Sequence, residues 1–148
     1  MVKIFLIAAF PDQFDLSHQR IKPAFKTKLQ YILHDLRQEG VTVSCTLEMD
    51  NWQLLEQLPE INLVQDIEAI DASDLVVAVA EDKPSAGVQF ELGYAAAKGK
   101  RVILARSSND ELSWFNQGTI GSGLVQHVTY QTMEMLLLQL VAAVRVLA

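Results

Sequence analysis

The sequence is poor in cysteine, in basic residues and in glycine and proline, and each shortage excludes a class of protein. Its single cysteine, Cys45, cannot form an internal disulfide, so we expect a reducing compartment and a small buried apolar role for this side chain. Lysine and arginine number 12 against 18 acidic residues, and the net charge of −6 argues against binding to nucleic acid polymers or anionic membranes. With only 7 glycines and 4 prolines, the chain is neither collagen-like nor of low complexity.

The sequence also lacks an apolar run long enough to cross a membrane. The longest such run, Met133 to Ala148, is interrupted by Glu134, Gln139 and Arg145 and falls short of the roughly 20 residues that a span needs. The apolar first ten residues lead directly into Pro11 and are too short for a secretion signal with its cleavage site. We therefore expect a soluble cytoplasmic protein, with residues 1–148 forming one domain.

Apolar, strand-like runs alternate with helical patterns along the chain. Strands are predicted at Val2–Ala9, Val41–Thr46, Leu75–Ala80, Val102–Ala105 and Gln126–Thr129. Helices are predicted at Ser17–Glu39, at Trp52–Leu58 where Pro59 stops the helix, over a stripe from Leu63 to Ala72, at Gly87–Lys98, and from Thr132 onward. The alternation indicates a small doubly wound α/β fold, flavodoxin- or Rossmann-like, whose parallel sheet is covered by helices on both faces. Ligands of such folds bind at the carboxyl ends of the strands.

The segment after the predicted strand Leu75–Ala80 carries the most information about function. Pro84-Ser85-Ala86-Gly87 opens a helix, where free backbone N–H groups and the Ser85 hydroxyl could hold a hydroxyl-rich or anionic ligand. Alternatively, Ser85 only caps the helix. Gly87 lies one helical turn before Glu91, where its missing side chain leaves room for a substrate beside the carboxylate. The segment is neither a P-loop nor a dinucleotide fingerprint.

The run Phe90-Glu91-Leu92-Gly93-Tyr94-Ala95, preceded by Ser85-Ala86-Gly87 and followed by Gly99-Lys100-Arg101-Val102-Ile103-Leu104, resembles a family signature. It is similar to the nucleoside 2-deoxyribosyltransferase family, which includes the 2′-deoxynucleoside 5′-phosphate N-hydrolases. The resemblance covers residues 66–105 and implies cleavage or transfer of an N-glycosidic bond. It implies that Glu91 is the nucleophile that attacks C1′ of the sugar and forms a glycosyl-enzyme. It further implies that Asp66 binds the sugar or assists proton movement at the base.

The same resemblance bears on the substrate and on the subunits. Ser85 stands where the N-hydrolases carry a phosphate-binding serine, whereas the first loop lacks their glycines and arginine and contains Asp12, which would repel a phosphate. In that loop Phe10 either stacks on a base or packs in the core. Ser122, or failing that Asn116, matches a residue that reaches into the neighbouring subunit's site; both are expected in a loop. No metal or other cofactor is implied, because the three histidines lack metal-ligand spacing.

The closing helix predicts a partner chain. Its apolar residues surround the helix instead of forming one stripe, so one packing face cannot bury them all, and we expect a homo-oligomer, at least a dimer.

Two other functions stay open. The fold could serve as a catalytically silent module that binds or senses nucleotides. A phosphoribohydrolase of the lysine-decarboxylase-like group is a variant of the enzyme hypothesis. That group has a PGGxGTxxE run, however, whereas this chain has PSAGVQFE.

Overall fold

The computed structural model describes residues 1–8, 14–15, 20–49, 52, 59–80, 86–107 and 114–147. Five strands form one parallel sheet in the order β4-β1-β5-β6-β7. Their bounds are β1 Lys3–Ala8, β4 Thr42–Cys45, β5 Leu75–Ala80, β6 Arg101–Ser107 and β7 Gln126–Tyr130. Two short strands, β2 (Phe14–Asp15) and β3 (Arg20–Ile21), pair with each other in antiparallel fashion. This order confirms the doubly wound α/β fold predicted from the alternating pattern.

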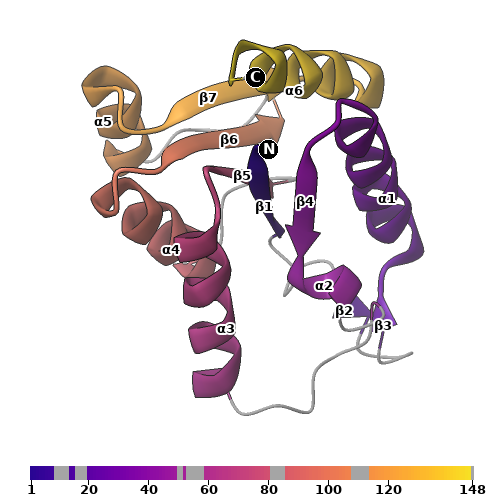
Figure 1. Cartoon of the computed structure of the whole chain (residues 1–148), viewed down its shortest axis with the longest axis horizontal. Helices are drawn as coiled ribbons and strands as arrows, with labels where there is room; N and C mark the ends of the chain where they lie inside the picture. Colours follow the sequence, from indigo (N-terminus) through magenta and orange to yellow (C-terminus); the bar gives the residue numbers. More distant parts are fainter. Residues whose placement is uncertain are drawn as a thin grey trace.

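Helices cover both faces of the sheet, as expected for parallel strands. They are α1 Pro23–Gln38, α2 Thr46–Met49, α3 Pro59–Ala72, α4 Ala86–Ala97, α5 Trp114–Ser122 and α6 Met133–Leu147. In Figure 1, α1 and α6 lie on one side of the strands, and α3, α4 and α5 lie on the other. Two apolar cores result, one between the sheet and α1 with α6, the other between the sheet and α3 with α4.

The central strand and the first helix fold as their patterns predict. All six residues of β5 are buried, because neighbouring strands and helices on both faces cover this apolar run. On α1 the predicted stripe faces the core, with these residues buried: Phe25, Leu29, Ile32, Leu33 and Leu36. The chain leaves α1 through Gly40, whose φ of 76° is the left-handed conformation that glycine adopts without strain.

The structure differs from four predictions, and two of the differences involve proline. The first helix starts at Pro23, because Arg20–Ile21 pairs as β3 and proline is favoured in a first helical turn. For the same reason Pro59 begins α3, four residues before the predicted stripe that starts at Leu63. The predicted helix Trp52–Leu58 is not seen at Trp52, which lies in a turn with a φ of 63°, and its remaining residues lie outside the described part. A polar loop is predicted from Ser107 to Ser122, whereas residues 114–122 form α5.

The closing helix α6 is partly covered. Leu136, Leu140 and Val144 are buried in the core that α6 shares with α1. Leu138 and Val146 are 69% and 73% exposed, so one packing face indeed leaves apolar residues uncovered. None of the described helices has the length and apolar character needed to span a membrane.

Candidate active site

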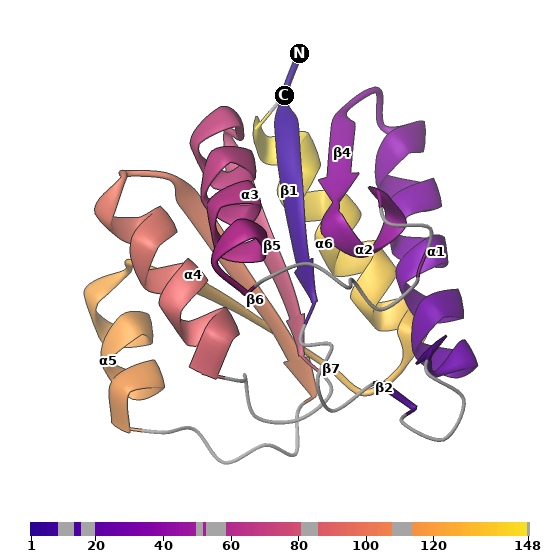
Figure 2. The same cartoon turned by 90° about the horizontal axis from the view of Figure 1, so that it is seen from below.

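Two carboxyl groups meet between α3 and α4. Asp66 lies in the middle of α3, which leads into β5, and Glu91 lies on α4, which follows β5. Both helices pack on the same face of the sheet, so residues 25 positions apart become neighbours, and the two side chains are hydrogen-bonded to each other. Figure 2 shows α3 and α4 on this face, with the arrowheads of β1, β5 and β6 pointing to one edge of the sheet. The structure therefore brings together the two residues that the sequence assigns to catalysis.

The environment of this pair favours a protonated Glu91. Burial raises the pKa of the Glu91 carboxyl, and the negative charge of Asp66 together with its hydrogen bond raises it further, from the ordinary 4.5 to about 8. Two carboxylates in contact cannot both ionise cheaply, so the pair holds one proton near neutral pH. Such a shared proton is typical of carboxyl pairs that exchange protons with a substrate.

A third residue, Thr46, contacts Asp66 from the helix that follows β4. It is the first residue of α2 and directly follows β4, at the same carboxyl edge. Its hydroxyl donates a hydrogen bond of 2.8 Å to Oδ1 of Asp66. The bond restricts rotation of the Asp66 carboxyl group. Thr46 is not among the site residues predicted from the sequence, although its place at the end of a strand next to β1 is a signal that could have identified it.

Asn62 lies one helical turn before Asp66 on α3, and therefore on the same side of the helix. Its side-chain oxygen Oδ1 is buried and has no hydrogen-bond partner, which is true of no other buried side-chain nitrogen or oxygen in the described part of the chain. No sequence pattern distinguishes Asn62 from a surface asparagine, so this residue could not be predicted from the sequence.

A buried cation lies at the carboxyl end of β6. Arg106 is 8% exposed. Side chains alternate between the two faces along a strand, so Arg106 is on the same face as Val102 and Leu104, which is the face covered by α3 and α4. Its Nε donates to Nδ1 of His127 at 3.4 Å, and Nε2 of His127 lies 3.0 Å from the Thr119 hydroxyl. Burial, followed by the charge of Arg106, lowers the pKa of His127.

The predicted substrate-binding residues fare differently. Ser85 and Phe10 lie outside the described residues. Gly87 is exposed in the first turn of α4, one turn before Glu91 as predicted. Asn116 and Ser122 belong to helix α5 and not to the expected loop; the side chain of Asn116 is not described. The Ser122 hydroxyl donates to the Thr119 carbonyl at 3.2 Å and accepts from the backbone N–H of Leu124 at 3.4 Å, so it closes the end of its own helix.

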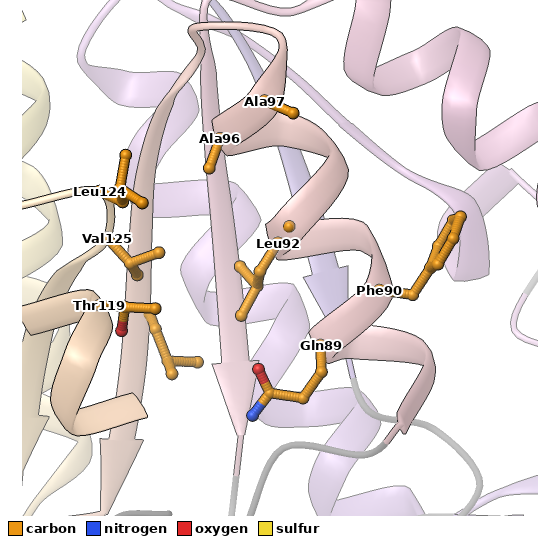
Figure 3. Close-up of a pocket in the computed structure, with 10 residues that line it drawn as sticks. Gln89, Phe90, Leu92, Ala96, Ala97, Thr119, Leu124 and Val125 are labelled. Carbon is orange, nitrogen blue, oxygen red and sulfur yellow. The ribbon is translucent and has the colours of Figure 1, made fainter. Parts of the chain in front are cut away.

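An apolar groove of about 800 Å³ lies on the other side of α4, between this helix and α5. Figure 3 shows Leu92 and Gln89 of α4 opposite Thr119, Leu124 and Val125. Glu91 and Asp66 do not line it, so the groove is separate from the carboxyl pair. It offers almost no polar groups for a nucleoside, which makes it a poorer substrate site than the polar region at Asp66.

The described residues contain no group of three or more His, Cys, Asp or Glu side chains that could hold a metal ion. Cys45 is buried as expected, and burial raises the pKa of its thiol, which suppresses the reactive thiolate.

Comparison with known proteins places this geometry in context. A family model described as Nucleoside 2-deoxyribosyltransferase matches residues 16–135. The structure of Clostridium botulinum CMP N-glycosidase, BcmB, is similar at a TM-score of 0.68 and 21% identity, covering 93% of this chain and 96% of that one. The solution structure of BlsM is similar at a TM-score of 0.68 and 23% identity, covering 97% and 89%. A 2-deoxyribosyltransferase from Bacillus psychrosaccharolyticus gives a TM-score of 0.60 and 20% identity, covering 90% and 88%. No curated protein matches the chain.

Proposed function

Because this chain belongs to the nucleoside 2-deoxyribosyltransferase family, we propose that it cleaves or transfers the N-glycosidic bond of a nucleoside, a deoxynucleoside or one of their 5′-monophosphates. Glu91 is the nucleophile, and Asp66 is the general acid and base that donates a proton to the leaving base and accepts one from the attacking group. The observation that carries the proposal is the hydrogen-bonded pair of carboxyl groups beside the carboxyl edge of the sheet. Retaining glycosidases use two carboxyl groups for the same two tasks.

The single proton of the pair accounts for the chemical step. In the free protein the proton resides on Glu91; transfer to Asp66 leaves Glu91 ionised and Asp66 able to donate. The Glu91 carboxylate then forms a bond to C1′ while the bond between C1′ and the base breaks. The bonding electrons go to the base nitrogen, which takes up the proton from Asp66. Water, or a second base, next attacks C1′ and releases Glu91, while Asp66 accepts the proton that the attacking group loses.

Two features bear on whether the substrate carries a 5′-phosphate, and they favour opposite answers. Ser85 favours a 5′-monophosphate, and a structural neighbour is a CMP N-glycosidase. The first loop, which has no glycine or arginine and contains Asp12, favours a substrate without a phosphate. This loop is also the feature that favours the second candidate function, a silent module that binds nucleotides without turnover.

We further propose that the chain works as a homo-oligomer. Leu138 and Val146 of α6 are apolar and exposed, which supports a second copy of the chain covering this surface. The groove beside α5 is a second apolar surface, and α5 carries Asn116 and Ser122, which the family resemblance assigns to a neighbour's site.

Release of free base from a panel of nucleosides, deoxynucleosides and their monophosphates tests the function. We expect turnover of at least one class, and a loss of at least about a thousandfold in Glu91→Ala, since this variant lacks the nucleophile. Glu68→Ala, which removes an exposed glutamate of α3, is the matched control and should keep full activity. Binding of a nucleotide without any release of base would instead support the silent module.

A further inference from the structure

The Oδ1 atom of Asn62 has no hydrogen-bond donor among the residues that the structure describes. A buried carbonyl without a donor is unfavourable, because water that would otherwise bind it has been removed. Asn62 Oδ1 is such an atom, although the side chain as a whole is only partly buried. A leucine of similar size would avoid this cost. An atom of this kind at a functional site indicates a donor that arrives with a ligand.

Asn62 lies near the start of α3, at the end of this helix that faces the carboxyl edge of the sheet. The chain passes from α3 directly into β5, so the start of α3 lies toward the carboxyl edge of the sheet, where ligands of this fold bind. Asn62 and Asp66 occupy the same side of α3 at a spacing of four residues. Asn62 therefore lies one turn farther toward the carboxyl edge than the Asp66–Glu91 pair, where the parts of a substrate beyond C1′ would sit.

We infer that Asn62 determines specificity: its Oδ1 accepts a hydrogen bond from an N–H or O–H donor of the substrate held beside Asp66 and Glu91. The inference rests on the proposed function for the identity of the ligand. Two sources supply such a donor, an exocyclic amino group of the base, as in cytosine and adenine, or a hydroxyl of the sugar. A base with a carbonyl at the same position would face Oδ1 with a second acceptor and be rejected.

Substrate pairs that differ by one donor distinguish these sources. Comparing CMP with UMP, and AMP with IMP, tests the exocyclic amino group, which UMP and IMP lack. Comparing each nucleotide with its 2′-deoxy and 3′-deoxy analogues tests the sugar hydroxyls. The corresponding nucleosides replace them if wild type prefers no phosphate. We expect wild type to prefer the donor-bearing member of one pair, by about ten- to a hundredfold in kcat/KM. Asn62→Leu should reduce that one ratio to near unity and leave the others unchanged. Gln65→Leu, the loss of an exposed amide on α3, is the control.

A second measurement needs no turnover. In the free protein Asn62→Leu removes the unpaired oxygen, so its urea midpoint should equal or exceed that of wild type, although its selectivity is lost. Binding of the same substrates to the Glu91→Gln background by calorimetry should show the same loss of one ratio. A lower midpoint would show that Oδ1 is already satisfied, and would overturn the inference.

The outcomes separate this inference from the proposed function. If wild type releases base and Asn62→Leu changes kcat/KM for all substrates by the same factor, or changes none, the role of Asn62 is refuted while the function stands. If no base is released but one binding ratio collapses, the role of Asn62 stands and the catalytic proposal fails. If no member of the panel is cleaved or bound, both are refuted.

Discussion

The replacement Glu91→Gln should stabilise the protein, and increasingly so as the pH rises. Folding places the Glu91 carboxyl in a partly buried site against Asp66, which raises its pKa to about 8. A group whose pKa is raised by folding stabilises the native state at low pH and loses that contribution as the pH rises to its folded pKa. Glutamine is neutral at every pH and similar in shape, and its amide can still donate to Asp66. It therefore imitates the protonated glutamate.

The size of the effect follows from the shift. From 4.5 to about 8 the change is about 3.5 units, and at about 1.4 kcal/mol per unit the ceiling is about 5 kcal/mol, reached above pH 8. Since Glu91 is only partly buried, local water reduces the penalty, and we expect a gain of about 2–3 kcal/mol at pH 8. At pH 5 most of the difference disappears, because this pH is only just above the unfolded pKa of 4.5, so Glu91 is largely protonated in the folded state and substantially protonated in the unfolded state as well.

Urea unfolding of wild type and Glu91→Gln at pH 5, 6, 7 and 8, followed by circular dichroism, measures this difference. The comparison cancels titrations that both proteins share, including that of His127. Glu134→Gln, which neutralises an exposed glutamate on α6, should show a difference of less than about 0.5 kcal/mol throughout. A gain that does not grow with pH, or a less stable Glu91→Gln protein at pH 8, would refute the strained carboxyl pair.

Further predictions concern the carboxyl pair, Thr46, His127 and the oligomeric state. Base release should fall above about pH 8, where the pair loses its last proton, and Asp66→Asn should lower the Glu91 pKa, measurable by carbon NMR of the carboxyl. Thr46→Val should lower base release by about tenfold, because the hydrogen bond that holds the Asp66 carboxyl group is lost, whereas Thr46→Ser should keep full activity; equal losses in both would contradict the role of the bond. The pKa of His127 is lowered by folding, so stability should decline below about pH 6.5, and His127→Gln should flatten this decline in urea unfolding. Light scattering at micromolar concentration should show at least a dimer, and Leu138→Glu should dissociate it if α6 forms the interface; an active monomer would contradict a shared site.

Strong local patterns predicted most elements correctly. The run Leu75–Ala80 and the stripe of α1 are where the periodicity placed them, because a central strand and an amphipathic helix each bury what their own sequence marks as apolar. Boundaries failed at Pro23 and Pro59, since proline both ends and begins helices and the pattern alone does not distinguish the two. Helix α5 was missed because its residues carry little helical periodicity and two glycines, Gly118 and Gly121.

The sequence by itself determined that the fold is doubly wound, that Glu91 lies on a helix after the central strand, and that the chain resembles its family around that residue. These are local properties, decided by residues within one element or its neighbours. Only the tertiary structure decided that Asp66 contacts Glu91, that the Thr46 hydroxyl holds Asp66 from the end of another strand, and that Asn62 buries an unpaired oxygen one turn away. The physical reason is that hydrogen bonding, burial and pKa depend on distances in space, and packing of α3, α4 and the end of β4 against one face sets those distances between residues up to 45 positions apart.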